Sequence, residues 1–174
     1  MFASVLHMIK KAKEMAGFRD FLKIGGLHDE ITEDKLITYL RDRGTKYKIK
    51  EIARKHIDEP CVYGVAFWHI NTIYLNSIIH RRMRTYTALQ LYIGRKHEHL
   101  HHTEEEIDFM NCSLAYYVIP KNLFISCGNA KSLAEKSFMP LDVATMAWRF
   151  NSMISAKENC PIDITARGGM INQP

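Results

Sequence analysis

Two adjacent stretches decide the fold: residues 64–77 read GVAFWHINTIYLNS, and residues 82–97 read RMRTYTALQLYIGRKH. The first stretch holds two β-rich runs separated by Asn71-Thr72, which is a suitable turn. We therefore expect a β-hairpin there. In the second stretch, apolar residues recur at helical spacing among arginines and no proline intervenes. This pattern predicts one long helix over about 78–102 with a basic side.

Helices are expected on both sides of this central unit. Thr32 is a suitable N-cap for a helix that Gly44 ends. Further along, Thr103 and Glu106 form a Thr-x-x-Glu capping box, which predicts a helix that finishes just before Pro120. Apolar periodicity predicts the remaining helices, one over 2–16 and a final pair over about 130–155.

The composition is that of an ordinary globular protein. Of the 174 residues, 47% are hydrophobic and 25% are charged, and no apolar run approaches the roughly 18 to 20 residues that span a bilayer. The four cysteines form no Cys-x-x-Cys pair, which favours reduced thiols and a cytoplasmic protein. We expect a mostly helical α+β fold with a small antiparallel sheet and a long central helix. A single domain should cover 1–160, followed by a tail over 161–174.

A possible metal motif lies near the end of the predicted long helix. The run His97-Glu98-His99-Leu100-His101 matches the His-Glu-x-x-His pattern. Residues four apart share one helix face, so His97 and His101 could bind a zinc ion while Glu98 takes a proton from the zinc-bound water. The alternative is that these histidines are solvated side chains at a helix C-terminus, where cations interact favourably with the helix dipole.

The order of the predicted elements resembles the ImmA/IrrE family of zinc-peptidase-like proteins, which are common beside repressors in phages and integrating elements. The 64–77 hairpin resembles the family's strand pair ending in Asn-Ser, and 82–97 resembles its Arg-rich entry into the zinc-binding helix. NCSLAYYVIP (111–120) is similar to the family's helix that ends in an apolar pair and proline, and SLAEKSFMPLDVATMAWRF (132–150) to its closing segment. The resemblance covers about 30–150 and implies a zincin-like domain.

The family's zinc-binding helix normally reads Phe-Thr-x-Ala-His-Glu-x-x-His, and this chain departs from it. In an alignment without gaps from Asn76-Ser77, the family's site positions fall on the following residues: the first histidine on Leu89 or Gln90, the glutamate on Gln90 or Leu91, the second histidine on Ile93 or Gly94, and the distal carboxylate near Phe109. None of these residues suits zinc. In this register the fold is kept and the metal site is lost.

In the rival register, the 97–101 run is itself the zinc motif. The resemblance then implies Glu106 as the third ligand, because Glu106-Ile107-Asp108 is similar to the family's acidic third-ligand segment; Glu104, Glu105 and Asp108 are the alternatives. The surroundings favour the first register. The stretch 85–94 is apolar, as a buried zincin helix would be, whereas 95–102 has the composition of a solvated helix end.

Each register predicts a function, and the resemblance implies a helix-turn-helix repressor as the protein partner in both. With the site lost, the protein binds such a regulator of a phage or mobile element without cutting it, and we favour this prediction. With the site active, zinc held by His97, His101 and Glu106 activates water, Glu98 is the general base, and the repressor is cleaved. The edge of the hairpin would hold that substrate extended.

Direct nucleic-acid binding is a third possibility, and we disfavour it. The net charge of +5 would allow it. Runs of charge are more often solvated faces than binding sites. The basic residues in question are Arg81, Arg82, Arg84, Arg95 and Lys96, with Lys46, Lys48, Lys50, Arg54 and Lys55.

Overall fold

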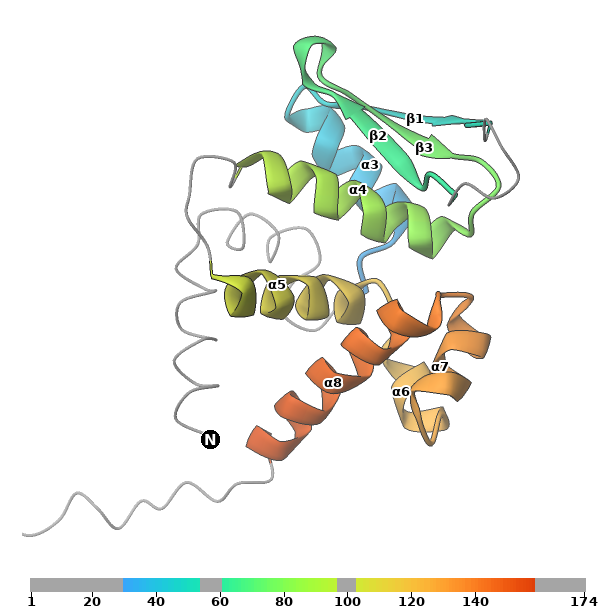
Figure 1. Cartoon of the computed structure of the whole chain (residues 1–174), viewed down its shortest axis with the longest axis vertical. Helices are drawn as coiled ribbons and strands as arrows, with labels where there is room; N and C mark the ends of the chain where they lie inside the picture. The colour runs from blue at the N-terminus through green and yellow to red at the C-terminus, as the bar shows by residue number, and fades with distance from the viewer. Residues whose placement is uncertain (1–29, 54–60, 97–102, 159–174) are drawn as a thin grey trace, which may run out of the picture.

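The computed structural model describes residues 30–53, 61–96 and 103–158. Their elements are α3 (Glu33–Asp42), β1 (Lys46–Lys50), β2 (Gly64–Phe67), the short 3-10 helix η1 (Trp68–Ile70), β3 (Thr72–Asn76), α4 (Arg81–Lys96), α5 (Glu104–Tyr117), α6 (Lys121–Ser126), α7 (Ala130–Ser137) and α8 (Leu141–Glu158). The predicted α+β, mostly helical fold is confirmed. Figure 1 shows the sheet at one end of the molecule, α4 along it, and helices α5 to α8 at the other end.

The predicted hairpin is present as β2 and β3. The two strands pair antiparallel, with Gly64 opposite Leu75 and Phe67 opposite Thr72. Between them lies η1, whose C-cap is Asn71; the φ of Asn71 is 48°, in the left-handed region that asparagine tolerates better than most residues. The turn therefore contains Asn71 as predicted, but it extends back over 68–70, and Thr72 already belongs to β3.

The third strand, β1, was not predicted. It pairs in parallel with β3, so the strand order is β1-β3-β2 and the sheet is mixed rather than purely antiparallel. The strand reads KYKIK, in which lysines alternate with Tyr47 and Ile49. Only two apolar residues mark it, and its pairing partner lies about 25 residues away in the sequence, so local patterning gives a weak signal.

The helix over 33–42 begins and ends as predicted. The Thr32 hydroxyl accepts a hydrogen bond from the backbone N–H of Lys35 at 3.4 Å, and Leu36 and Leu40 are fully buried. After the C-cap, Gly44 adopts a φ of +73° and donates to the carbonyl of Arg41 at 2.9 Å. A side chain would be strained in that conformation, so glycine is the residue that lets the chain turn into β1.

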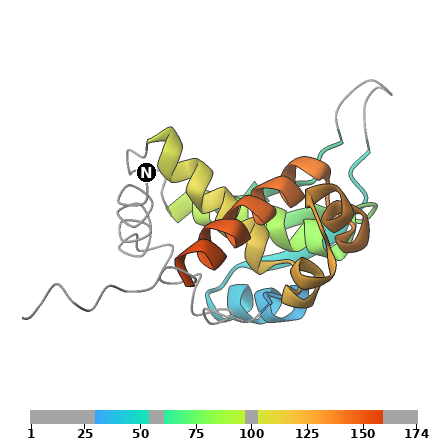
Figure 2. The same ribbon diagram turned by 90° about the horizontal axis from the view of Figure 1, so that it is seen from below.

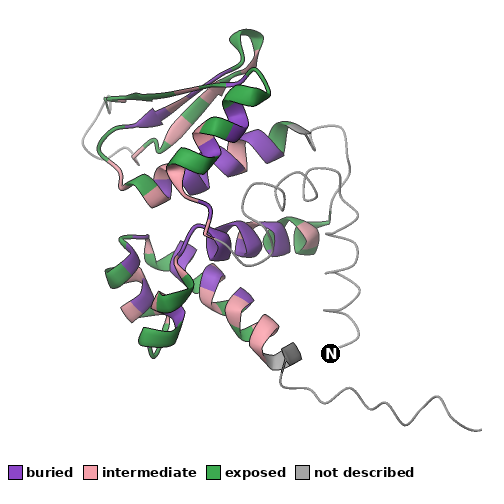
Figure 3. Ribbon diagram, turned by 180° about the vertical axis from the view of Figure 1, so that it is seen from behind, coloured by how far each residue is buried: buried purple, intermediate pink, exposed green. Residues whose placement is uncertain are grey.

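The core lies between the sheet and the helices. Helices α3 and α4 cover the inner face of the sheet, where Ile73 and Leu75 are fully buried. Figure 3 shows that buried residues also occupy most of α5, which joins the two ends of the molecule. The capping box predicted at Thr103 and Glu106 is present at the start of α5, and the helix finishes at Tyr117, close to the predicted end.

The helical end is built on contacts between α5 and α8, which lie across one another in Figure 2. The centre of the Phe150 ring on α8 is 5.3 Å from the centre of the Tyr116 ring and 5.4 Å from the centre of the Phe109 ring. The predicted final pair of helices is present as α7 and α8, while the short helix α6 after Pro120 was not predicted. No helix in the described ranges is both long and apolar enough to cross a bilayer.

The predicted helix over 2–16 and the tail over 161–174 lie outside the described residues. The end of the long helix predicted beyond Lys96 lies outside them as well. The division into a domain over 1–160 and a tail therefore stays a prediction.

Candidate functional site

In the ungapped register, the positions of the family's zinc ligands lie on α4 and on α5. Leu89 and Ile93 on α4 are 0% and 2% exposed, and Phe109 on α5 is 5% exposed. All three belong to one continuous hydrophobic core. Gly94 is exposed and has no side chain. The positions at which this register would place metal ligands are therefore taken mostly by apolar core side chains.

Gln90 is the one polar side chain at these positions, and its amide N–H groups are hydrogen-bonded to neutral neighbours. Its Nε2 donates to the hydroxyl of Tyr86 at 2.9 Å and to Oδ1 of Asn111 at 3.1 Å. Burial raises the pKa of Tyr86, so the phenol stays protonated. Gln90, Tyr86 and Asn111 thus form a neutral hydrogen-bonded group, which offers zinc no anionic or imidazole ligand. The residues of this register do not fit a zinc ion.

The rival motif cannot be placed, because His97, Glu98 and His101 lie outside the described residues. Glu106, its predicted third ligand, lies in the capping box of α5. Its Oε2 accepts from the backbone N–H of Thr103 at 3.1 Å, and its own N–H donates to the Thr103 hydroxyl at 3.2 Å. The carboxylate thus has a structural role at the helix N-terminus, and its role as a zinc ligand stays a prediction.

The other acidic candidates lie on the same helix. Glu104 and Glu105 are exposed in its first turn, and one oxygen of Asp108 is 3.3 Å from the guanidinium of Arg149 on α8. Burial, with the nearby charge of Asp108, raises the pKa of the Cys112 thiol to about 11, so this thiol is protonated near neutral pH. Across 30–53, 61–96 and 103–158, no group of three His, Cys, Asp or Glu side chains could hold a metal ion.

Arg84, which the sequence places on the basic side of α4, is tied into the fold. Its Nε and NH2 atoms contact the two carboxylate oxygens of Glu33 on α3 at 2.7 and 3.0 Å. The Tyr47 hydroxyl on β1 donates to the same carboxylate at 2.6 Å. Burial alone would raise the pKa of Glu33, but the hydrogen bonds from Arg84 and Tyr47 and the charge of Arg84 outweigh it and lower that pKa.

Two other arginines on this helix also have partners. Arg82 lies 3.7 Å from the carboxylate of Glu30 and donates to the carbonyl of Ser137 at 3.0 Å. The guanidinium of Arg95 lies 4.7 Å from the centre of the Trp68 ring. With Arg84, these contacts give three of the predicted basic residues structural roles, which weakens the case for nucleic-acid binding along α4.

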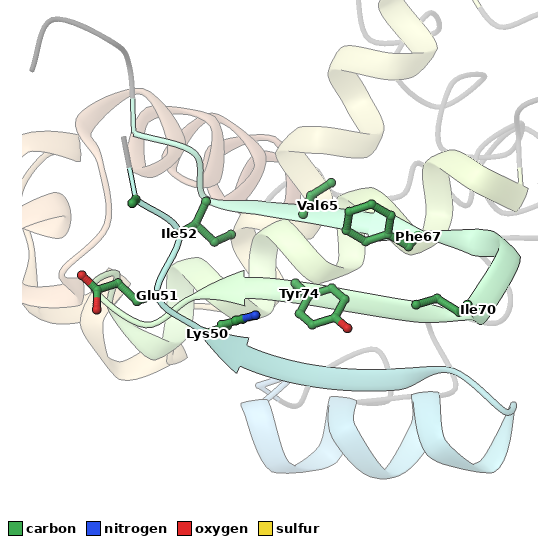
Figure 4. Close-up of a pocket in the computed structure, with 8 residues that line it drawn as sticks. Lys50, Glu51, Ile52, Val65, Phe67, Ile70 and Tyr74 are labelled. Carbon is green, nitrogen blue, oxygen red and sulfur yellow. The ribbon is translucent and has the colours of Figure 1, made fainter. Parts of the chain in front are cut away.

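A groove of about 520 Å³ opens on the outer face of the sheet, on the side away from α4 (Figure 4). Val65 and Phe67 of β2 and Tyr74 of β3 point into it, and Ile70 closes one end. The lining is completed by the last residue of β1, Lys50, and by the three residues after the strand, Glu51, Ile52 and Ala53. The sequence carries a signal for this groove that we missed: Val65, Phe67 and Tyr74 on the outward side of the hairpin are large apolar or aromatic residues, where a solvated face would carry polar ones.

Strand β2 also has a free edge among the described residues, since β3 is its only strand neighbour there. The N–H of Asn76 donates to the carbonyl of Tyr63, which makes this a hydrogen-bonded pair. Bonded and non-bonded pairs alternate along an antiparallel ladder. The backbone groups of Gly64 and Ala66 therefore point away from β3, as a strand that accepts a further strand would present them.

Comparisons of the chain with protein-family models, with curated proteins and with solved structures found no match.

Proposed function

We propose that this chain is a divergent ImmA/IrrE-like protein that binds a regulator, by resemblance a helix-turn-helix repressor of a phage or mobile element, without cleaving it. Three observations support the proposal: the order of the elements, the packing between α4 and α5, and the free edge of β2.

The packing between α4 and α5 carries the most weight. By resemblance to the ImmA/IrrE family, an active zinc site would need ligands on the central helix and on the helix that follows. Here Leu89, Ile93 and Phe109 occupy those positions as core residues, and Gln90 is hydrogen-bonded to Asn111. A chain with this packing can keep a partner-binding surface while lacking the metal that would polarise a peptide bond.

The free edge of β2 supports binding of an extended segment. The outward N–H and C=O groups of Gly64 and Ala66 could pair with a partner strand, and main-chain hydrogen bonds of this kind give affinity that depends little on sequence. The neighbouring outward side chains of Val65 and Phe67 would add selectivity.

The deciding experiment combines metal content with the fate of the partner. Untagged protein and a His97→Ala/His101→Ala variant are analysed for bound zinc. Each is then mixed with the candidate repressor and separated by size-exclusion chromatography, and intact-mass spectrometry of the fractions shows whether the repressor is whole or cleaved. We expect the repressor to co-elute intact with both proteins. Stoichiometric zinc that the variant loses, together with cleaved repressor, would replace this proposal by the active peptidase with Glu98 as its general base.

A second variant tests the edge itself. Ala66→Pro removes one outward N–H, and proline is tolerated on an edge strand where its N–H faces away from the ladder. We expect weaker repressor binding with little loss of stability. Ala66→Ser, which keeps the outward N–H at the same position and so changes no edge hydrogen bond, is the matched control. Equal binding by Ala66→Pro and the native protein would show that the edge is not used.

A further inference from the structure

The outer face of the sheet has two unlike halves. On β1, Lys46, Lys48 and Lys50 alternate along one face of the strand and are exposed. None of the three has an ion-pair partner within the described residues. On β2, Val65 and Phe67 are 36% and 41% exposed. A positive row and an apolar row thus run side by side.

Tyr74 of β3 forms the floor between the two rows. The register places it opposite Lys48 on one side and Val65 on the other. The ammonium of Lys48 lies 5.7 Å from the centre of the Tyr74 ring, and the ring of Phe67 lies 5.7 Å from it. The basic row and the apolar row therefore border one surface rather than two separate ones.

The width of this surface fits a helix. Adjacent strands are about 4.8 Å apart, so the outer strands β1 and β2 lie roughly 10 Å apart. An α-helix with its side chains is about 10–12 Å across. A helix lying along β3 would place one side against the lysines and another against Val65 and Phe67.

Backbone hydrogen bonding also favours a helix on this face. The backbone groups of β3 are used by β1 and β2, so they cannot pair with a segment that lies on top of the sheet. An extended segment there would leave its own N–H and C=O groups without partners in an apolar groove, which is costly. A helix satisfies its backbone internally.

We propose that the outer face of the sheet binds an amphipathic helix of another protein, with apolar residues in the groove and acidic residues beside Lys46, Lys48 and Lys50. This site differs from the free edge of β2 because it uses side chains on the face of the sheet rather than outward backbone groups, although Val65 and Phe67 border both. The proposal therefore does not rest on edge pairing by the regulator. The helix predicted over 2–16 of this chain is a poor occupant, because Lys10, Lys11 and Lys13 would face like charges.

The geometry of the rings argues against single-stranded nucleic acid. Base stacking needs ring faces laid open. Here Phe67 meets Tyr74 edge to face, with an interplanar angle of 83°, and meets His69 in the same way at 89°. Lys48 lies over the Tyr74 ring as well.

The test is fluorescence anisotropy with a labelled synthetic peptide. The peptide has about 20 residues, long enough to form a helix on its own, with leucines along one side and glutamates along the adjacent side. A second peptide with glutamine at each glutamate position controls for charge. We expect the acidic peptide to bind at least about tenfold more tightly than the glutamine peptide, and its affinity to fall with added salt.

Protein variants locate the binding. Lys48→Glu and Phe67→Ala should each weaken binding of the acidic peptide about tenfold, since one reverses a charge beside the groove and the other removes an aromatic anchor. Lys131→Glu on α7, an exposed lysine away from the sheet, makes the same charge change and should bind normally. Thermal unfolding of each variant checks that the fold is retained.

Four results would overturn the proposal. The first is no binding of the acidic peptide at millimolar concentration. The second is equal binding of the acidic and glutamine peptides, and the third is an equal loss of binding in Lys48→Glu and Lys131→Glu. The fourth is tighter binding of a 12-nucleotide oligo-dT than of the peptide, lost in Lys48→Glu, which would identify this face as a nucleic-acid surface.

Discussion

The two faces of the three-stranded sheet are made by neighbouring residues of the same strands, yet they differ in what covers them. On the inner face, Ile73 and Leu75 are fully buried under α3 and α4. On the outer face, the next residue along β3, Tyr74, lines an open groove beside the exposed Phe67. A strand turns successive side chains to opposite sides, so one step in sequence separates a core position from a surface position.

This difference separates residues that hold the fold from residues available for binding. Polar residues would suffice on a face that only meets water, and the lysines of β1 follow that rule. Val65 and Phe67 do not follow it, and burial in the core does not require them. Substitutions on the two faces should therefore differ in which property they change, stability or binding.

The largest effect is expected for Leu75→Ala on the inner face. Leu75 is fully buried, and removing its side chain leaves a cavity that the packed helices cannot readily fill. We expect the free energy of unfolding, measured by urea denaturation, to fall by about 3 kcal/mol. Val65→Ala, on the outer face of β2, is the control and should cost much less. Similar losses for both would contradict the division between the two faces.

The second effect concerns the ion pair between Glu33 and Arg84 beside the sheet. Glu33 accepts from Tyr47 of β1 and from Arg84 of α4, so it connects the inner side of the sheet to both helices. Replacing it by glutamine removes a charge-assisted hydrogen-bond network and should lower the free energy of unfolding by about 2 kcal/mol at neutral pH. Urea denaturation of the native protein and Glu33→Gln measures this.

The same variant predicts a pH dependence. The pKa of Glu33 is lower in the folded protein than its ordinary value of 4.5. The folded state therefore gains stability from this group above that ordinary pKa, and loses it as the pH falls through the lowered folded value. The stability difference between the native protein and Glu33→Gln should be constant at neutral pH and shrink below about pH 4.5. A difference that grows on acidification would show that the ion pair does not stabilise the fold.

The third effect tests how closely β2 approaches its neighbours on the inner side. A Cβ added at Gly64 would lie 2.6 Å from Cδ2 of Leu75 and 2.9 Å from the carbonyl oxygen of Tyr74. The backbone oxygen cannot move without disturbing the ladder, so Gly64→Ala should cost ~1.5 kcal/mol. Gly94→Ala on α4 meets nothing within 4 Å and should stabilise the protein by about 0.5 to 1 kcal/mol. If urea denaturation showed that both substitutions change the free energy of unfolding in the same direction, this contrast would be wrong.

Features with a local cause could be predicted from the sequence. The Thr32 cap, the Gly44 turn, the hairpin and the capping box at Thr103 each depend on residues a few positions apart, and each is present. Strand β1 was missed because its lysines mask a two-residue apolar pattern and because its partner is distant in the sequence.

The site depended on contacts that local patterns do not encode. The sequence assigns Arg84 to a solvated basic side, whereas it pairs with Glu33 from 51 positions away. The sequence predicts a binding edge on the hairpin, but the groove beside it needs Lys50 and Ile52, which only the parallel pairing of β1 brings there. The choice between the two zinc registers rests on 97–102, outside the described residues, so both the prediction of zinc and the preference for its absence stay predictions.

The smallest effect on stability is expected on the outer face, and it completes the comparison. Phe67 is 41% exposed, so truncating it removes a contact that is already partly solvated. We expect Phe67→Ala to lower the free energy of unfolding by less than about 1 kcal/mol, well under the loss for Leu75→Ala. The same substitution should weaken binding of the acidic helical peptide about tenfold. A residue that contributes little to the fold and much to binding marks a functional surface, whereas a loss of stability as large as that of Leu75→Ala would make Phe67 a core residue and the outer face a second packing face.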